Sequence, residues 1–589
     1  MLSWLSVRRR WRSKAGLVFA IAVVTVQSAE LGAERQPIAR LTVDDQLAQL
    51  LFVGFEGTGI TPELRRLVAD WHVGGVVLYA QNIDSAEQVE RLNREIQALG
   101  ENGVAPFIAI DQEGGSVARL HEGVLQLPGA MALGATRSPD LARRAGDSLG
   151  RNLRALGFTM NFAPVLDVLS NPENTALGTR AFSSDPEVVA SLGSAFIHGE
   201  RNAGIIPVAK HFPGQGGTAG DSHYTLPVLD VTRHQLAKRE LVPFRAAIAA
   251  GVPAIMTAHI ALPRVAETPD TPATLSRRLL SGTLRQSLGF QGLVITDELQ
   301  MRAVQGRRKI GDVAVDALLA GADMIMIVWD KNDREEIYAA LKSAYASGRL
   351  PASVVERALR HVLAAKAALS TAPRRPPSST DEQVWLVERI AEEAITVDGG
   401  HPALEIRPND GVVFIGVDGP LRRRFARSPW IPTPPRVDDA IVRDASRTIG
   451  DGSLIVAAIA SENDRALVSQ VRRALPDRRL IVVCLASPQL LAGIDNPETV
   501  IYAYSDLSPF QEAAAKVLLE GKAAHGILPI PSFVAQFAIT TRCSASSHPA
   551  RALSTSSERP RCCPRSSNSC RDRQCWRRVA TRSGRSSDR

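Results

Sequence analysis

GLVITDEL, residues 292–299, is a short segment that is almost wholly apolar until it ends in two carboxylates. A near-continuous apolar strand is buried on both faces, which is typical of parallel sheets covered by helices. Seven further runs of this kind occur between about residues 50 and 330. They are LFVGFEG (51–57), GGVVLYA (74–80), FIAIDQEG (107–114), FTMNFAPVLDV (158–168), IIPVAKHFPG (205–214), AIMTAHI (254–260) and DMIMIV (323–328).

Segments with a helical pattern separate most of these runs, such as SAEQVERLNREIQALG (85–100) and DALLAGA (316–322). Eight strand–helix units in about 280 residues predict an α/β fold of the (β/α)8 or TIM-barrel type. On pattern alone, a doubly wound open sheet is the alternative.

A smaller unit follows the barrel. The segment 351–370 predicts a closing helix for a catalytic domain over residues 34–370, and Pro/Ser-rich residues begin a linker over 371–381. Four strand candidates then indicate a smaller α/β sandwich domain over residues 382–530. These candidates are GVVFIGVD (411–418), SLIVAAIA (453–460), RLIVVCLA (479–486) and TVIYAYS (499–505).

The N-terminus predicts an export signal over residues 1–33. A basic stretch ending at Lys14 precedes the apolar run AGLVFAIAVVTV (15–26), and small residues follow. This run has the length of a signal-peptide core and is short for a membrane span, so we expect a periplasmic or secreted protein. An uncleaved anchor is the alternative.

The C-terminal segment 531–589 is rich in Ser, Arg and Cys and has no helix or strand period, which predicts a disordered or aberrant tail. Its cysteines match no strong zinc-ligand spacing.

Residues 551–589 contain eleven arginines and three acids, which account for the whole net charge of +8. The body has no basic excess, so a nucleic-acid-binding protein is not expected. It contains a single cysteine, Cys484, and therefore no internal disulfide.

Polar residues collect at or near the C-terminal ends of the apolar runs. In a TIM barrel this rim carries the active site, because the loops that follow the strands converge there. The clustering therefore predicts a site at the rim. Its members are Asp111, Asp167, Lys210, His211, His259 and Asp297.

The stretch KHFPGQGGTAGDSH (210–223) begins at the end of the fifth run and continues into a glycine-rich loop, for which we expect flexibility. Asp221 and His223 lie two residues apart, so both can face the same side of an extended segment. An aspartate beside a histidine can fix its tautomer and stabilise its charged form, which makes His223 a candidate general acid. A surface turn is the alternative.

Asp297 ends the seventh run, where a carboxylate points into the mouth of a barrel and can attack a sugar anomeric carbon. Strand alternation places the adjacent Glu298 on the opposite side, so we assign it a supporting role. A helix N-cap at Asp297 is the alternative. Asp111, Arg119 and Arg180 follow the third and fourth runs, and such groups suit sugar hydroxyls, although each could form a structural ion pair instead.

These stretches resemble glycoside hydrolase family 3, and specifically its bacterial β-N-acetylglucosaminidase branch. The matching motifs occur in the expected order over residues 40–335. They are IDQEGG (110–115), NFAPVLDV (161–168), GTRAFSSDP (178–186), KHFPGQGGTAGDSH (210–223), IMTAHI (255–260) and ITDELQM (295–301).

The resemblance implies a retaining exo-β-N-acetylhexosaminidase that forms a covalent intermediate on Asp297, with Asp221 and His223 as the acid/base dyad. It implies a carbohydrate substrate with terminal β-linked N-acetylglucosamine, of the kind found in peptidoglycan fragments, and no metal or organic cofactor. The residues implied to bind this sugar are Asp111, Arg119, Arg180, Lys210 and His211.

The chain departs from the family pattern at two positions. Gln215 replaces the second histidine of the usual KHFPGHG, and Ser116 replaces the arginine of the usual DQEGGR. Gln215 can form hydrogen bonds but cannot take a charge, so loop position or substrate preference could differ. Three alternative functions remain open, namely a phosphorylase of the same substrates, a β-glucosidase-like family 3 enzyme and an inactive sugar-binding protein.

Overall fold

The structure, a computed structural model, describes residues 41–100, 104–220, 222, 224–398, 406 and 411–532. The chain divides into two compact units, residues 1–539 and 540–589, and every described residue belongs to the first. The expected export signal, the tail beyond Ser532 and the dyad Asp221 and His223 lie outside the described residues. In the described ranges, no helix is long and apolar enough to cross a membrane.

Eight parallel strands close a barrel in the order β1 to β8, and each falls within one of the predicted apolar runs. The closed barrel confirms the (β/α)8 prediction and excludes the doubly wound sheet. The strands are β1 (Leu51–Val53), β2 (Gly75–Leu78), β3 (Phe107–Ile110), β4 (Met160–Asn161), β5 (Ile206–Phe212), β6 (Ala254–Thr257), β7 (Leu293–Glu298) and β8 (Met324–Ile327).

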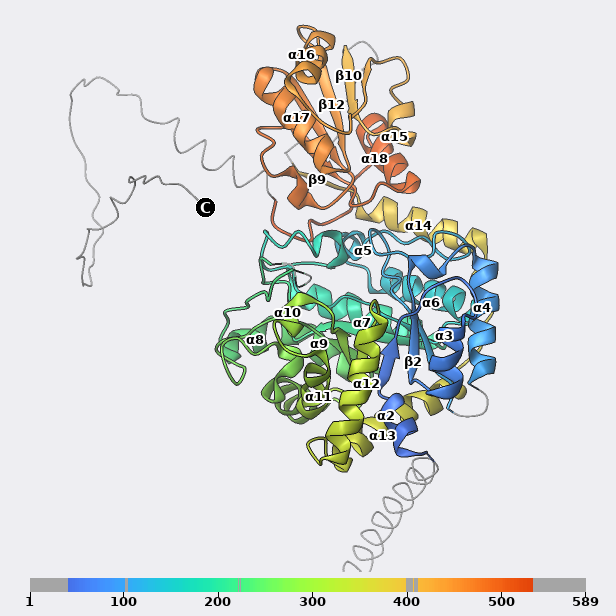
Figure 1. Cartoon of the computed structure of the whole chain (residues 1–589). Coiled ribbons are helices and arrows are strands. Elements are labelled where there is room, and N and C mark those ends of the chain that lie inside the picture. Colours follow the sequence, from blue (N-terminus) through green and yellow to red (C-terminus); the bar gives the residue numbers. More distant parts are fainter. Residues whose placement is uncertain are drawn as a thin grey trace, which may run out of the picture. The chain divides into compact units, whose positions relative to one another are not determined.

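Helices follow the strands and surround the barrel (Figure 1). They are α2 (Val43–Ala48), α3 (Pro62–Arg65), η1 (Arg66–Asp70), η2 (Ala80–Asn82), α4 (Ala86–Leu99), α5 (Ala130–Thr136), α6 (Pro139–Ala155), η3 (Gly178–Arg180), α7 (Pro186–Asn202), α8 (Arg233–Lys238), α9 (Leu241–Ala249), η4 (Ala273–Leu275), η5 (Arg278–Ser287), α10 (Arg302–Gln305), α11 (Ile310–Ala320), α12 (Lys331–Ala346) and α13 (Ala352–Ser370).

Aromatic side chains fill the barrel beneath the rim. The ring of Phe52 stacks on Phe107 with 6.4 Å between centroids and meets Phe162 edge-on at 5.6 Å. Gly75 of β2 makes room for this cluster, because a Cβ there would lie 2.7 Å from the ring of Phe52. Each buried phenylalanine contributes about 1.5–3 kcal/mol of hydrophobic stabilisation. The interior is therefore a packed core that supports the site above it.

The second part is a six-stranded sheet in the order β11-β10-β12-β13-β14-β9, in which only β9 is antiparallel to its neighbour. Helices α16 and α17 pack together, as do α15 and α18 (Figure 1). All four predicted strands are present, whereas β9 and β11 were not predicted. The elements are β9 (Thr396–Asp398), β10 (Val412–Gly416), α15 (Pro420–Arg423), β11 (Trp430–Ile431), α16 (Asp439–Thr448), β12 (Leu454–Ile459), α17 (Glu462–Ala474), β13 (Arg479–Cys484), η6 (Pro488–Leu491), β14 (Thr499–Tyr502) and α18 (Ser508–Glu520).

The segment between α13 and the second sheet is packed against the barrel. Ser378 is buried and its hydroxyl donates to the amide oxygen of Asn152 at 2.8 Å, while the hydroxyl of Ser148 donates to Ser378 at 2.7 Å. Helix α14 (Thr380–Ala394) then begins inside the range expected for the linker, with Ser379 as its N-cap. Both hydrogen bonds join this segment to α6.

Candidate active site

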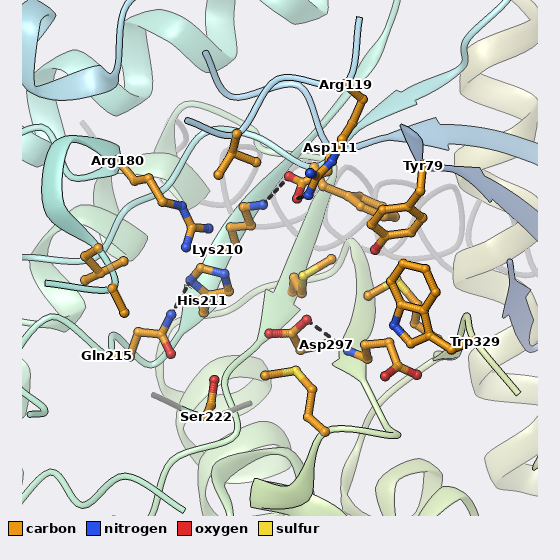
Figure 2. Close-up of a pocket in the computed structure, with 18 of the residues that line it drawn as sticks. Tyr79, Asp111, Arg119, Arg180, Lys210, His211, Gln215, Ser222, Asp297 and Trp329 are labelled. Carbon is orange, nitrogen blue, oxygen red and sulfur yellow. Dashed lines mark hydrogen bonds and ion pairs between the residues drawn. The ribbon is translucent and has the colours of Figure 1, made fainter. Parts of the chain in front are cut away.

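A cavity of about 460 Å³ opens at the C-terminal ends of the barrel strands. This volume lies in the range of small-molecule sites. Six of the predicted site residues line it, and Figure 2 shows Asp297 at its centre. They are Asp111, Arg119, Arg180, Lys210, His211 and Asp297.

Asp297 lies next to the end of β7 and does not cap a helix, because α10 begins at Arg302 after an N-cap at Met301. Burial by itself would raise the pKa of Asp297, but the nearby imidazole of His211, the backbone N–H of Glu298 and the ammonium group of Lys210 outweigh burial and lower this pKa. One carboxylate oxygen also accepts the backbone N–H of Glu298 at 2.9 Å. Asp297 is therefore ionised at neutral pH, as a nucleophile requires.

Glu298 lines the same cavity, although strand alternation predicted that it would face away from Asp297. Its carboxyl group accepts the backbone N–H groups of Gln300 at 3.1 Å and Val328 at 3.4 Å. Burial raises the pKa of Glu298 to about 8, more than these hydrogen bonds lower it. The two adjacent carboxyl groups thus differ in charge near neutral pH, and Glu298 ties the end of β7 to the loop after β8.

His259, directly beyond β6, fixes the backbone of this strand end. Its Nε2 lies 3.0 Å from the carbonyl oxygen of Glu298, which can only accept, so Nε2 carries the proton. Its Nδ1 lies 2.7 Å from the hydroxyl of Thr274 and accepts from it. Burial lowers the pKa of His259, so the ring is neutral at pH 7 and its role in the described geometry is to hold Glu298.

Four charged side chains form a buried network on one wall of the cavity. The Nζ of Lys210 lies 2.6 Å from Asp111 and 2.6 Å from Glu113. Arg180 donates to both oxygens of Glu113, at 2.8 and 2.7 Å. Burial would raise the pKa of Glu113, but Arg180 and Lys210 outweigh burial and lower it. Glu113 therefore holds the two cations that the sequence assigns to sugar binding.

The loop after β3 places Arg119 beside Asp111. The side chain of Gln112 accepts the backbone N–H of Arg119 at 2.7 Å, which closes the loop. The guanidinium group then lies 3.4 Å from Asp111 and 5.4 Å from the ring centroid of Tyr79. Burial and the charges of Asp111 and Asp297 raise the pKa of Tyr79, so its hydroxyl remains a donor.

His211 is oriented by Asp167, which lies in the loop after β4. Its Nδ1 donates to a carboxylate oxygen of Asp167 at 2.7 Å, and the other oxygen accepts the backbone N–H of Gln215 at 2.7 Å. The side-chain amide of Gln215 lies 3.0 Å from the same ring nitrogen. Gln215 thus contacts His211 with a neutral group where the family pattern has a second histidine.

The first part of the glycine-rich loop is closely packed rather than open. A Cβ at Gly216 would lie 1.9 Å from the carbonyl oxygen of Val168, so only glycine fits there. The side chain of Asn174 donates to the carbonyl of Gln215 at 3.0 Å and so holds this part of the loop. Glycine here therefore serves close approach, which corrects the expectation of flexibility for these residues.

The second part of the loop reaches the cavity. Gly220 and Ser222 both line it, and they are the residues on either side of Asp221 in the chain, while Asp221 and His223 lie outside the described residues. A residue of η6 in the second part of the chain supports the loop that contains Asn174. The side-chain amide of Gln489 donates to the carbonyls of Pro172 at 2.6 Å and Asn174 at 3.2 Å, and we call these two hydrogen bonds the Gln489 brace. In the described ranges, no group of three or more His, Cys, Asp or Glu residues could hold a metal ion.

Sequence reasoning missed three residues of the site. Glu113 was part of a quoted motif, but its role depends on Arg180, which lies 67 residues away in the chain. Tyr79 and Trp329 follow β2 and β8, and both line the cavity. The rule that located the charged residues at strand ends also applies to them, but they are aromatic and were not considered as site residues.

An ionised carboxylate at the rim of a barrel, beside a wall of hydrogen-bonding side chains, is an arrangement that suits a glycoside hydrolase of the TIM-barrel class. The comparisons with known proteins agree. A family model described as the glycosyl hydrolase family 3 N terminal domain matches residues 42–365. The chain belongs to glycoside hydrolase family 3.

Known relatives extend this similarity. The chain is 33% identical over 386 residues to a beta-hexosaminidase A of Pseudoalteromonas piscicida, covering 61% of this chain and 64% of that protein. It is 38% identical over 283 residues to a beta-hexosaminidase of Thioalkalivibrio sulfidiphilus, covering 47% and 80%. A solved family 3 beta-N-acetylglucosaminidase from a Paenibacillus species superposes with a TM-score of 0.76 at 34% identity, covering 84% of this chain and 99% of that one.

Proposed function

We propose that this protein is a retaining exo-β-N-acetylhexosaminidase that removes terminal β-linked N-acetylglucosamine, with Asp297 as its nucleophile. The observation that carries the proposal is the ionised Asp297 at the centre of a cavity whose wall is the Asp111, Lys210 and Arg180 network. Relatives named as beta-hexosaminidases and the beta-N-acetylglucosaminidase structure support the choice of sugar.

The charged wall suits the sugar that reacts. Asp111 can accept hydrogen bonds from sugar hydroxyls, and Arg119, Arg180, Lys210 and His211 can donate to hydroxyl and acetamido oxygens. The side chains of Lys210 and Asp111 are only 3% and 15% exposed, so this wall is the more enclosed end of the cavity. A closed end beyond the nucleophile fits an enzyme that acts at a chain terminus.

The reaction follows in two steps. The Asp297 carboxylate attacks the anomeric carbon while His223, supported by Asp221, gives its proton to the departing oxygen, so the glycosidic bond breaks as the ester bond forms. Water then attacks the same carbon, gives its proton to His223 and releases Asp297. Two inversions at one carbon retain the β configuration. The natural substrate that we propose is a peptidoglycan fragment, encountered after export from the cytoplasm.

The test uses Asp297→Ala with p-nitrophenyl N-acetyl-β-glucosaminide. Loss of the nucleophile should lower kcat by about 10³-fold or more. Sodium azide should restore release of nitrophenol and give the α-linked glycosyl azide, because azide fits the space left by the carboxylate and attacks the same carbon. The matched control is Asp230→Ala, which removes a carboxylate that is 60% exposed and paired with Arg264.

Three results would contradict the proposal. They are near wild-type turnover by Asp297→Ala, a preference of the wild type for the aryl glucoside or xyloside, and formation of a sugar 1-phosphate when phosphate is added. The last result would indicate a phosphorylase. Absence of any turnover by the wild type would instead support a sugar-binding protein.

A further inference from the structure

Trp329 follows β8 and is unusual among the cavity residues because its side chain is largely in solvent. It is 55% exposed and yet lines the same cavity as Asp297. Two other described tryptophans, Trp385 and Trp430, are also partly exposed, at 49% and 38%, but neither lines this cavity. Exposure of a large apolar ring at a binding cavity is a feature that a ligand can use.

The backbone of Trp329 is fixed relative to the strand that carries Asp297. The side-chain oxygen of Gln300, in the loop after β7, accepts the N–H of Trp329 at 2.7 Å. The amide nitrogen of Gln300 in turn donates to Asp333 at 2.6 Å, so the Gln300 side chain is held at both ends. The ring of Trp329 is therefore presented from a backbone tied to β7.

The ring itself packs against Tyr79. Their centroids are 5.0 Å apart with an angle of 48° between the planes. On another side, the guanidinium group of Arg119 lies over Tyr79, 5.4 Å from the ring centroid. Tyr79 is thus held between two neighbours, whereas Trp329 leaves much of its surface open.

The two walls of the cavity differ in both chemistry and depth. Figure 2 shows Tyr79 and Trp329 on one side of Asp297 and Arg180, Lys210 and His211 on the other. The charged wall is the less exposed one, with Lys210 at 3% and Arg180 at 19%, and the aromatic wall is the more open one, with Trp329 at 55%. An exo-acting enzyme needs a closed place for the terminal sugar and an open place for the departing group.

We propose that Trp329 and Tyr79 bind the pyranose ring of the leaving group, which makes Trp329 a determinant of substrate specificity. The inference rests on the proposed function and adds the chemistry of the departing group. A β-linked pyranose presents a flat face of C–H groups that can lie on an aromatic ring, and its hydroxyls lie at the edge. A polar side chain, that of Gln81, also lines the cavity.

The test compares kcat/KM of the full chain for two N-acetyl-β-glucosaminides whose leaving groups are both alcohols. In N,N′-diacetylchitobiose the departing group is a pyranose, and in the methyl glycoside it has no ring. We expect the contact with one ring to be worth about a tenfold preference, by comparison with aromatic pairs. Trp329→Ala should therefore lower the chitobiose-to-methyl ratio about tenfold, and Trp329→Phe should retain most of it.

Trp385→Ala is the matched control, since it truncates a half-exposed tryptophan on α14 and should keep the wild-type ratio. If Trp329→Ala leaves the chitobiose-to-methyl ratio of kcat/KM unchanged, the inference about Trp329 is overturned, while the proposed function stands. A larger loss on the p-nitrophenyl glycoside than on chitobiose would also overturn it, since that would identify a site for aryl groups. Failure of the wild type to cleave even the methyl and aryl N-acetylglucosaminides would refute the proposed function as well, so the two failures can be distinguished.

Discussion

Replacing Glu113 by glutamine should disturb the site although it leaves Asp297 and the acid/base pair untouched. The Glu113 side chain is 6% exposed and receives hydrogen bonds from Arg180 at 2.8 and 2.7 Å. It also lies 2.6 Å from the Nζ of Lys210. Glutamine has nearly the same shape but removes the charge, so Arg180 and Lys210 would both lose the carboxylate that they contact, and Lys210 would retain Asp111.

The magnitude follows from the burial of these groups. Removing one partner of a buried ion pair costs about 3–5 kcal/mol, because the remaining charge stays desolvated. Glutamine keeps one acceptor oxygen, so we expect the lower end, about 3 kcal/mol of unfolding free energy. In a large domain each kcal/mol lowers Tm by about 2–4 °C, which gives a decrease of about 6–12 °C. Since Arg180 and Lys210 would shift, kcat/KM should also fall by about tenfold or more.

The effect should depend on pH with a defined sign. Burial raises the pKa of Glu113, but Arg180 and Lys210 lower it to a net value below the ordinary 4.5. A carboxyl group whose folded pKa is depressed stabilises the protein fully above its unfolded pKa and loses this contribution as pH falls through the folded one. The difference in unfolding free energy between the wild type and Glu113→Gln should therefore be largest at neutral pH, and it should become smaller below about pH 4.5.

The assay is thermal unfolding of both proteins at pH 7 and at a series of acidic values, together with kcat/KM at pH 7. Asp140→Asn is the control, because Asp140 also pairs with two arginines, Arg143 at 2.7 Å and Arg144 at 2.6 Å, but is 57% exposed. Such exposed pairs contribute at most about 1 kcal/mol. The reasoning is refuted if Glu113→Gln behaves like this control, or if its gap to the wild type stays constant in acid.

Two further predictions concern the supports of the site. Burial raises the pKa of Glu298 to about 8, so the folded protein keeps a proton that the unfolded chain loses above the ordinary 4.5, and stability falls as pH rises between these values. Glutamine at position 298 cannot ionise, so thermal unfolding should show the wild type losing stability relative to Glu298→Gln from pH 5 to pH 8. Parallel plots of Tm against pH for the two proteins would contradict this. Gln489→Ala removes two hydrogen bonds to the loop that contains Asn174, and kcat/KM should fall by about three- to tenfold. The control Gln291→Ala, at an exposed position, should have the kcat/KM of the wild type. A wild-type kcat/KM for Gln489→Ala would contradict the role given to the Gln489 brace.

The barrel could be predicted because its signal repeats. All eight apolar runs contain a strand, and the runs extend beyond the strands mainly at their C-terminal ends, where the polar site residues begin. The sheet elements that were missed are β9 and β11, with three and two residues. Strands this short have no periodicity of their own, and they form because neighbouring strands supply hydrogen bonds, which a local pattern does not reveal.

The site was predictable where position along a strand decides it. Asp111, Lys210, His211 and Asp297 line one cavity because the C-terminal ends of parallel strands meet at one rim. The partners of these residues were not predictable, because contacts such as that of Lys210 with Asp111 join residues 99 positions apart. Gly216 shows the same limit, since the close approach to Val168 that requires glycine depends on tertiary packing.

Strand alternation assigned Asp297 and Glu298 to opposite sides, but both line the cavity. The difference between their roles follows instead from the charges around each carboxyl group. Burial would raise both pKa values, and only Asp297 has His211 and Lys210 near enough to reverse it. The negative charge of Asp297 itself raises the pKa of Glu298, so ionisation of one carboxyl group helps keep the other protonated. A single negative charge therefore remains at this strand end near neutral pH, on the carboxylate that faces the charged wall. Glu298, held by the backbone of Gln300 and Val328, secures the loop that carries Trp329 without competing for the anomeric carbon.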